Sequence, residues 1–484
     1  MKRTLVLGGP GAGKTRRLLG VMEEALDQGI PPGRVAFVSF TKAAVNEART
    51  RACERFGLQP RDLPYFRTLH SLAFRELGLQ RHDIVGEEHL AELALTTGEL
   101  FTGDATTEGP AAGRNADPLL TLDHYARTTM TSLRDAWQDH GGEVEWFRLK
   151  RFSDAYHDYK REREIMDFTD LLIAYVDSAL PPVGVDVAVV DEVQDLTLRQ
   201  HAVVDKAFAN AKALWWAGDD DQSIHRWAGA AEDRLYALEC DREVLPLSHR
   251  LPSEIFNLSQ QVVRRIGRRF AKDQGAVRTG GRVEWVSGAD EVDLSSGTWL
   301  LLARTRAQLD HHVQLAREQG VVYRLKGETS VKAEHVRAIL AYENLRAGRR
   351  VDGLMVADAL RAAGVRKNID EGSSYTADEL GFDTKPIWHD ALVRIPLEDR
   401  EYYLTCLRRG EKLTEPPRVR VETIHGAKGL ESESTLLITD MTYRTHRGYE
   451  LDPDSEMRVL YVGLTRASDN LVLVAPQTAY GYSF

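Results

Sequence analysis

The sequence contains few cysteines and no long apolar run. Cys53, Cys240 and Cys406 lie far apart and are odd in number, so we expect reduced structural thiols rather than disulfides or a zinc site. No segment approaches the roughly 18 consecutive apolar residues of a membrane-spanning helix. The run Thr4–Leu7 is also too short for the apolar region of a secretory signal. These absences predict a cytoplasmic protein that makes no use of a membrane.

The chain also lacks an excess of basic residues. It has 63 lysines and arginines against 73 aspartates and glutamates, which gives a net charge of -10. Phosphate binding normally shows as a basic excess, so this balance argues at first against a nucleic-acid partner. A protein that must release nucleic acid repeatedly needs only a local groove. One local basic stretch consists of Arg264, Arg265, Arg268, Arg269 and Lys272. Its alternative interpretation is a solvated helix face.

With 484 residues, of which 43% are hydrophobic, the chain exceeds what one core usually organises, so at least two domains are expected. Short β-branched runs alternate with amphipathic stretches, which is the pattern of doubly wound, parallel α/β domains. The expected strands are Thr4–Leu7, Val35–Ser39, Val185–Val190 and Ala213–Ala217 in the first half, then Val244–Leu247, Trp299–Ala303, Val419–Thr423, Thr435–Ile438 and Leu471–Val474.

Two stretches break this alternation. Residues 80–165 are mostly helical, with a loop rich in Thr, Gly and Pro around Thr102–Pro118, and residues 348–417 are polar with scattered Gly and Pro. We interpret them as one insertion per domain. The first domain is then expected to comprise residues 1–79 and 166–243, and the second residues 244–347 and 418–484.

A phosphate-binding loop is the strongest local motif. Residues 8–15, GGPGAGKT, fit the pattern G-x-x-x-x-G-K-[ST] directly after an expected strand. Gly8, Gly11 and Gly13 allow backbone N–H groups to converge on phosphate oxygens. Lys14 would supply charge at the β and γ phosphates, and the Thr15 hydroxyl would reach Mg²⁺. The alternative is a chance glycine-rich turn.

An acidic motif, DEVQD at residues 191–195, follows the expected strand Val185–Val190. A carboxylate at the carboxyl end of a parallel strand lies at the edge of the sheet where ligands bind. Asp191 is the natural partner of Mg²⁺, and Glu192 is the natural general base for an attacking water. The alternative is an ordinary acidic loop.

With these motifs in place, the chain resembles the UvrD/Rep-like ATP-dependent DNA helicases of superfamily 1, in motif order and over nearly its whole length. The further matching segments are FTKAA (40–44), TLHSL (68–72), DFTDLL (167–172), GDDDQSIHRW (218–227), SHR (248–250), TIHGAKGLE (423–431) and YVGLTRA (461–467).

The resemblance implies two RecA-like domains with ATP and Mg²⁺ bound between them. It assigns Gln222 to sensing the γ-phosphate and Glu431 to the ribose. It also makes Arg250 and Arg466 arginine fingers from the second domain. Such roles suit phosphoryl transfer, which depends on positioning and on cations placed at the developing charge.

The resemblance also implies contacts with single-stranded DNA. Trp227 would offer a face on which any base can stack, so the grip would tolerate every sequence. Core packing is the alternative for Trp227, and simple burial is the alternative for Phe40. The implied DNA contacts are Phe40, Thr41, Thr68, His70, His225 and Trp227 in the first domain and His425 in the second.

The chain departs from the family pattern around the nucleotide base. Seven residues precede Gly8, so the upstream glutamine that reads adenine in the family has no counterpart in this sequence. His249 replaces a tyrosine, and Arg16 is a second candidate to stack on the base. Because stacking hardly discriminates between bases, we expect loose selectivity for ATP over GTP. His225 and Ala228 likewise replace a tyrosine and an arginine.

The sequence as a whole predicts a monomeric motor that moves on single-stranded DNA and unwinds tailed duplex DNA. Its 3′→5′ polarity is implied by the resemblance only. Two alternatives stay open at this point. One is an RNA-directed or 5′→3′ motor of the same superfamily. The other is an ATP-switched single-strand binding or loading factor with little unwinding activity.

Overall fold

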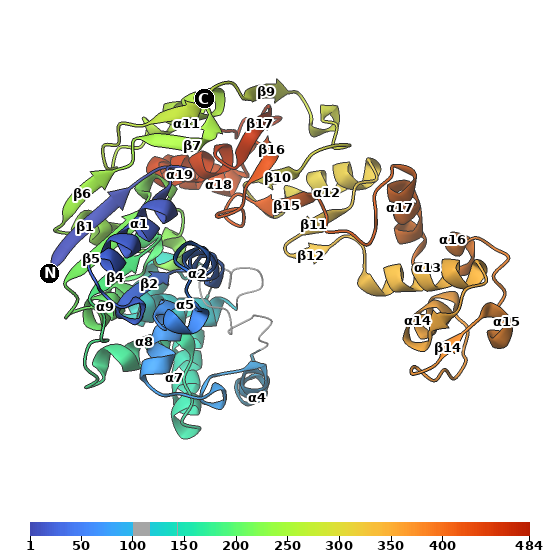
Figure 1. The fold of residues 1–484 in the computed structure, drawn as a ribbon, viewed down its shortest axis with the longest axis horizontal. Helices are drawn as coiled ribbons and strands as arrows, with labels where there is room; N and C mark the ends of the chain where they lie inside the picture. Colours follow the sequence, from blue (N-terminus) through green and yellow to red (C-terminus); the bar gives the residue numbers. More distant parts are fainter. Residues whose placement is uncertain (100–116, 143) are drawn as a thin grey trace. The chain divides into compact units, whose positions relative to one another are not determined.

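The computed structural model describes residues 1–99, 117–142 and 144–484 (Figure 1). The chain forms two compact units. The first comprises residues 1–251 and 263–278, and the second comprises residues 252–262 and 279–484. Each unit is built around one large sheet. All strand pairs of the first sheet are parallel, and the second sheet contains one antiparallel pair. No described helix is long and apolar enough to cross a membrane.

The first unit contains a six-stranded sheet with the order β3-β2-β4-β5-β1-β6. Every neighbouring pair in it is parallel. Such sheets are covered on both faces, which is why β2 and β4 read as continuous apolar runs. The strands are β1 (Lys2–Leu7), β2 (Val35–Ser39), β3 (Phe66–Thr68), β4 (Val187–Val190), β5 (Ala213–Gly218) and β6 (Asp241–Val244).

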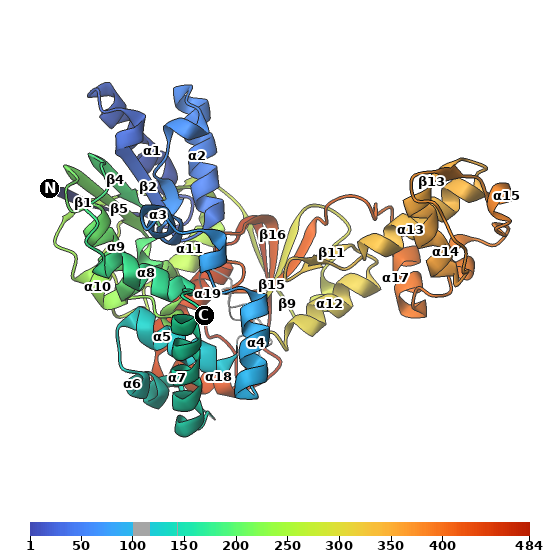
Figure 2. The same cartoon turned by 90° about the horizontal axis from the view of Figure 1, so that it is seen from below.

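Helices cover both faces of this sheet, as Figure 2 shows. Val6 of β1 packs with one layer of helices, whereas its neighbours Leu5 and Leu7 pack with the other. Successive side chains of a strand point to opposite faces, so one strand serves both layers. The first layer is α1 (Lys14–Asp27) and α2 (Lys42–Phe56), and the second is α3 (Leu69–Glu76), α8 (Phe168–Asp177) and α9 (Leu198–Ala207).

A helical insertion with its own small core interrupts the first unit. Leu90, Leu122, Phe152 and Tyr156 are buried together in this core. The loop expected around Thr102–Pro118 lies mostly outside the described residues. The described helices of the insertion are α4 (Glu87–Thr97), α5 (Pro118–Thr129), α6 (Leu133–His140) and α7 (Trp146–Glu162), and α10 (Glu232–Tyr236) follows later in the unit.

A buried ionic cluster fastens this insertion to α8. Asp167 lies 2.7 Å from Arg127 of α5 and 2.6 Å from Lys160 of α7. Its Oδ1 also accepts the N–H groups of Thr169 and Asp170, which caps α8. Burial acts to raise the pKa of Asp167, but Arg127 and Lys160 together hold this pKa well below the usual value. The insertion is therefore locked to the sheet-bearing part through compensated charges.

The second unit contains a seven-stranded sheet with the order β12-β11-β15-β10-β16-β17-β9, in which only β12 is antiparallel to its neighbour. Its strands are β9 (Arg282–Val286), β10 (Trp299–Ala303), β11 (Tyr323–Leu325), β12 (Glu328–Thr329), β15 (Val419–Thr423), β16 (Ser432–Ile438) and β17 (Ala467–Val474). The accompanying helices are α11 (Ser253–Val263), α12 (Leu309–Glu318), α18 (Tyr443–Leu451) and α19 (Pro453–Leu464).

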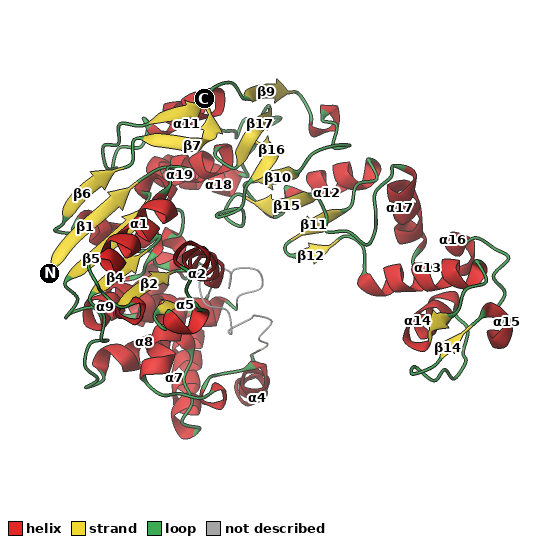
Figure 3. Ribbon diagram, in the orientation of Figure 1, coloured by secondary structure: helices red, strands yellow, loops and turns green. Residues whose placement is uncertain are grey.

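The rest of the second unit is mainly helical, as Figure 3 shows. Tyr342, Leu360, Trp388 and Tyr403 are buried there. The helices are α13 (Ala333–Arg346), α14 (Gly353–Ala363), α15 (Ala377–Leu380), α16 (Trp388–Ala391) and α17 (Leu397–Arg408), and β13 (Val351–Asp352) pairs with β14 (Ser374–Tyr375).

The predicted fold class is confirmed: two parallel α/β units, each with a mainly helical part. The predicted strand Val244–Leu247 is wrong. β6 ends at Val244, and β7 (Leu247–Pro252) begins a separate pairing with β8 (Gly275–Arg278). The break falls at Pro246, which has no N–H to give to a strand ladder. All three cysteines are free thiols, as expected.

The basic stretch from Arg264 to Lys272 is not a solvated helix face: Arg264, Arg265 and Arg268 are exposed, whereas Lys272 is buried. The helix α11 ends at Val263, before this stretch begins. Lys272 is buried, with a side chain only 1% exposed, against three aspartates. Arg269 pairs with one of these aspartates, and Arg268 pairs with Asp233. This part of the chain also belongs to the first unit, whereas the sequence-based boundary placed it in the second.

The two lysines of α7 provide a test of the buried cluster. Replacing Lys160 by Met leaves Asp167 and Asp170 without one of their cations, so we expect a loss of about 3 to 5 kcal/mol in the free energy of unfolding. Lys150 forms an exposed pair with Asp154 on the same helix, and Lys150→Met is expected to cost less than about 1 kcal/mol. Urea unfolding of both variants checks this, and equal losses would contradict the account.

Candidate nucleotide site and nucleic-acid surface

The strand order brings three candidate loops to one edge of the first sheet. β4, β5 and β1 are adjacent and parallel, so their carboxyl ends share that edge. The phosphate-binding loop follows β1, and the acidic pair Asp191 and Glu192 follows β4. The loop containing Gln222 follows β5. Candidates that lie up to about two hundred residues apart in sequence therefore meet at this edge.

The phosphate-binding loop has the backbone that its glycines permit. Gly11 and Gly13 have φ values of 71° and 86°, in the left-handed region that side chains disfavour. Lys14 begins α1, and its Nζ donates to the Gly8 carbonyl oxygen over 2.9 Å. Thr15 follows in the first turn. The ammonium group is thus held across the loop, at the amino end of a helix, where backbone N–H groups and the helix dipole favour phosphate.

Asp191 and Glu192 are adjacent carboxylates, and Glu192 has an unusual backbone conformation. Burial, and then the neighbouring Glu192 carboxylate, raise the pKa of Asp191 to about 7, while Lys14 acts in the opposite direction. Glu192 has a φ of 54°, which is unusual for a residue other than glycine. A buried carboxylate with a raised pKa gains by binding a cation, and oxygen donors such as Asp191 and the Thr15 hydroxyl are those that Mg²⁺ prefers.

Gln194 links this pair to the loop after β5. Its Nε2 donates to Glu192, and its Oε1 accepts the N–H of Asp219 over 3.1 Å. Asp219 in turn accepts from Nε2 of Gln222 over 2.7 Å. The general-base candidate and the phosphate-sensor candidate are therefore joined through Gln194 and Asp219. Gln194 belongs to the DEVQD motif and Asp219 to the GDDDQSIHRW motif, but the sequence alone assigned neither residue a role.

Three consecutive aspartates, Asp219, Asp220 and Asp221, are buried beside Gln222. Their carboxylate oxygens lie within 4.8 Å of one another, a spacing that suits a metal ion. The Lys272 ammonium fills this role instead, at 2.7 Å from Asp219 and 2.8 Å from Asp221. Arg269 adds two hydrogen bonds to Asp221. A run of aspartates directly after a buried strand is the sequence signal that lysine or arginine side chains must lie nearby to balance the buried negative charge.

The segment from Ser248 to Arg250 packs directly on the phosphate-binding loop. Ser248 Oγ donates to the Pro10 carbonyl oxygen over 2.7 Å, and the His249 N–H donates to that of Gly11 over 3.0 Å. Arg250 therefore lies in the first unit, which corrects its expected place in the second domain. The side chains of His249 and Arg16 are exposed on this unit.

The second unit carries the other three candidates. Arg466 is only 3% exposed, and its guanidinium donates to the carbonyl oxygens of Val462 and Leu430 over 2.9 and 3.2 Å. Glu431 is exposed in the turn that leads into β16. Burial, and then the charges of Arg304 and Lys428, lower the pKa of His425 to about 3. The His425 imidazole is therefore neutral at physiological pH.

The proposed DNA contacts of the first unit divide into exposed and buried residues. Trp227 is 45% exposed, so its alternative as a core residue is wrong. His225 lies between Trp227 and the half-buried Phe40, with ring centroids 6.3 and 6.4 Å away. Thr41 is exposed and caps α2. The other candidates are buried: His225 itself, Thr68, which caps α3, and His70, which lies edge-on to Phe168.

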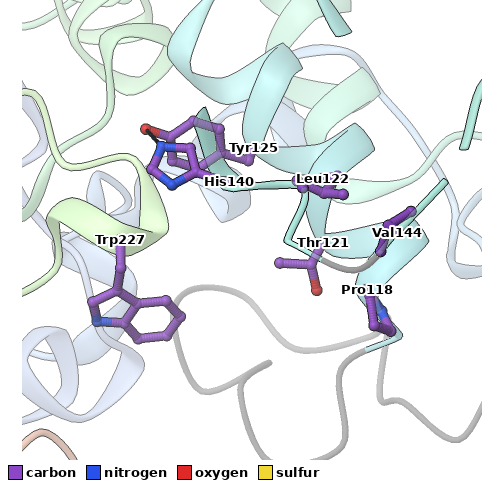
Figure 4. Close-up of a pocket in the computed structure, with 8 residues that line it drawn as sticks. Pro118, Thr121, Leu122, Tyr125, His140, Val144 and Trp227 are labelled. Atoms are coloured by element: carbon purple, nitrogen blue, oxygen red, sulfur yellow. Dashed lines mark hydrogen bonds between the residues drawn. The ribbon is translucent and has the colours of Figure 1, made fainter. Parts of the chain in front are cut away.

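A hollow of about 330 Å³ lies between Trp227 and the helical insertion (Figure 4). Figure 4 shows Tyr125 and His140 beside each other, and His140 Nε2 lies 3.0 Å from the Tyr125 hydroxyl. The lining residues are Pro118, Thr121, Leu122, Tyr125, His140, Gly141, Val144 and Trp227. An aromatic face with open space beside it can accept a flat ligand.

Gly11 provides a test of the loop geometry. A Cβ at this position would lie 2.3 Å from Cβ of Arg250, whereas a Cβ on Gly29, which shares a positive φ, would meet nothing within 4 Å. Gly11→Ala is expected to displace the loop and slow ATP turnover by about 10²-fold, the effect of a misplaced catalytic group. Gly29→Ala should cost only roughly 1 to 2 kcal/mol of stability. Turnover and thermal melting decide, and normal turnover in Gly11→Ala contradicts the geometry.

Comparison with known proteins agrees with this geometry. The family model of the UvrD/REP helicase N-terminal domain matches residues 1–242, and that of the UvrD-like helicase C-terminal domain matches residues 403–478. Together these two matches include every candidate residue except His249 and Arg250.

Several curated relatives are similar to the chain. The ATP-dependent DNA helicase UvrD2 of Mycobacterium tuberculosis is 24% identical over an alignment of 568 positions, gaps included. The alignment covers 97% of this chain and 76% of UvrD2. The ATP-dependent DNA helicase PcrA of Staphylococcus aureus is 24% identical over 300 residues, and YjcD of Bacillus subtilis is 25% identical over 296. The chain spans only 40% of the length of PcrA and 38% of that of YjcD. With motifs, folds and both family matches in agreement, the chain belongs to the UvrD/Rep helicase family.

Proposed function

We propose that the protein is an ATP-dependent DNA helicase that moves along single-stranded DNA in the 3′→5′ direction and unwinds duplex DNA. The observation that carries this proposal is the convergence of Lys14, Asp191, Glu192 and Gln222 at one sheet edge, joined through Gln194 and Asp219. The two large parallel-sheet units suit a motor in which nucleotide binding changes how two parts of the chain grip a strand.

Each residue of the edge has a definite task in the proposed hydrolysis. Lys14 and the loop N–H groups bind the phosphates of ATP. Thr15 and Asp191 would hold Mg²⁺, which would supply positive charge beside the phosphates. Glu192 takes a proton from the attacking water, and the bond from Gln194 keeps its carboxylate oriented. Gln222 then detects whether the γ-phosphate is present.

Domain closure is proposed to complete the nucleotide site. Arg250 already lies against the phosphate-binding loop, and Arg466 would come from the second unit. The hydrogen bonds of Arg466 to two carbonyl oxygens orient its guanidinium before ATP is bound. This lowers the entropic cost of positioning it for catalysis. Glu431 would bind the ribose, while His249 and Arg16 would hold the base by stacking.

The proposed DNA path in the first unit runs over Phe40, Thr41 and Trp227, the accessible members of the predicted set. His225 is buried between the two larger rings, so we assign it to supporting them rather than to contacting DNA directly. Since Thr68 and His70 are buried, we assign them to holding the loop that borders this path. In the second unit His425 would contribute as a neutral imidazole.

The remaining sequence-based expectations stay part of the proposal. They include single-stranded and tailed duplex DNA as ligands, a monomer as the active form and a cytoplasmic location. Residues 80–165 and 348–417 are proposed as the insertions of two RecA-like domains. The predicted domain bounds, 1–79 and 166–243 for the first and 244–347 and 418–484 for the second, are kept, except that we assign residues 244–251 and 263–278 to the first domain.

Glu192→Gln is expected to bind ATP and DNA but to lose ATP turnover, because a general base contributes about 10² to 10⁴ in rate. Glu164→Gln is the matched control, since Glu164 is another glutamate with a positive φ, at 55°, and is exposed. Steady-state ATPase is measured with single-stranded DNA, single-stranded RNA and no nucleic acid. The proposal fails if Glu192→Gln keeps more than about a tenth of the wild-type rate, or if RNA stimulates turnover more than DNA does.

Trp227→Ala should weaken binding to single-stranded DNA by roughly 5- to 150-fold, because losing a base–aromatic stack costs about 1 to 3 kcal/mol. The dependence of binding on salt should barely change, since no phosphate contact is removed. Trp285→Ala is the control, because Trp285 is 46% exposed and packs on Phe484. Fluorescence titration measures affinity, and thermal melting checks folding. A folded Trp227→Ala protein with unchanged affinity would exclude the stacking role.

A further inference from the structure

Lys272 is the centre of the most completely buried charge cluster beside the nucleotide edge. Its side chain is 1% exposed, and its Nζ contacts all three carboxylates of Asp219, Asp220 and Asp221. Arg269 binds Asp221 twice, and the Phe270 N–H donates to Asp220 over 2.7 Å. Three carboxylates thus face two cations and a backbone donor, and such closely packed carboxylates are tolerated in the interior only when cations lie beside them.

The protonation state of Asp219 determines how Gln222 is held. Burial acts to raise the pKa of Asp219, but the charges of Lys272 and then Lys14 lower it below the ordinary value. An ionised carboxylate only accepts hydrogen bonds, so the Gln222 amide must turn its NH₂ group toward Asp219. The amide oxygen of Gln222 then points elsewhere, as an acceptor. A neutral Asp219 would allow the opposite orientation of the amide.

Lys272 also lies on a segment that leaves the second unit and returns to the first. Residues 263–278 belong to the first unit, although the residues before and after them, 252–262 and 279–484, belong to the second. Lys272, Arg269 and Phe270 all lie on this returning segment. The loop that carries Gln222 is therefore fastened to a piece of chain that is covalently continuous with the second unit at both ends.

From this geometry we propose that Lys272 is a positioning residue for ATP hydrolysis, which fixes the orientation of the Gln222 amide through Asp219 and ties the Gln222 loop to the returning segment. This inference rests on the proposed function, in which Gln222 senses the γ-phosphate. It assigns a role to a residue that lies outside every motif of the sequence. The reacting atoms are touched by Gln222, and Lys272 acts through its neighbour.

The test is a double-mutant cycle between Lys272 and Gln222. Lys272→Met alone leaves excess negative charge in the interior, so it is combined with Asp220→Asn, which restores the net charge that the cluster has in the wild type. This paired variant should lower kcat of DNA-stimulated ATPase by at least about tenfold, with KM for ATP changed less than about threefold. Added to Gln222→Ala, the same pair of changes should lower kcat by less than about twofold further, because the two sites act as one.

Two further variants separate positioning from general stability. Lys272→Arg keeps the charge and should restore kcat to within about threefold of wild type, although its planar head fits three carboxylates less well. Lys160→Met removes a lysine buried between two other aspartates of the same unit, Asp167 and Asp170, and should leave kcat within about twofold. Thermal melting and circular dichroism of each variant confirm folding before turnover is compared.

The possible outcomes are distinct. A normal kcat in the folded paired variant, beside a slow Gln222→Ala, overturns the role of Lys272 but leaves the sensor role intact. Independent, multiplicative losses in the cycle also overturn it, since they indicate a structural effect only. An unchanged kcat in Gln222→Ala overturns the sensor role and this inference together. A slow paired variant with no further loss in the Gln222→Ala background is the expected result.

Discussion

The structure depends on one topological constraint, the adjacency of β4, β5 and β1 in a parallel sheet. Parallel strands deliver the chain to the same edge each time, so three loops from distant parts of the sequence must meet there. The phosphate-binding loop, the acidic pair and the Gln222 loop are chemically incomplete alone. Their shared edge joins, within one network, the residues to which we assign phosphate binding, metal binding, general-base catalysis and phosphate sensing.

Buried charge gives this edge its fixed geometry. Asp191 and Glu192 sit together despite their repulsion, with Lys14 as the nearby cation. Asp219, Asp220 and Asp221 are held by Lys272 and Arg269. Such clusters are costly to bury, and they tolerate few alternative arrangements because each carboxylate needs its partner. The same reasoning applies to Asp167, which locks the helical insertion through Arg127 and Lys160.

The sequence predicted what depends on local patterns and missed what depends on the path of the chain. The phosphate-binding loop, the acidic pair and most strands of the two large sheets follow from periodicity and spacing of neighbouring residues. Lys272 meets aspartates about fifty positions away, and Ser248 meets Pro10 from 238 positions away, so no local pattern announces these contacts. A basic run shows that counter-charges exist somewhere, but it does not say whether they are phosphates or buried aspartates.

The central claim is that ATP hydrolysis at this edge drives directional strand separation. Strand displacement on duplexes with a single-stranded 3′ tail, a 5′ tail or no tail tests it most directly, with ATP and Mg²⁺ supplied to the wild-type protein and to Glu192→Gln. The account predicts displacement of the 3′-tailed duplex only, dependent on ATP and absent from Glu192→Gln. ATP turnover stimulated by DNA without displacement of any duplex would contradict it, as would displacement from the 5′ tail alone.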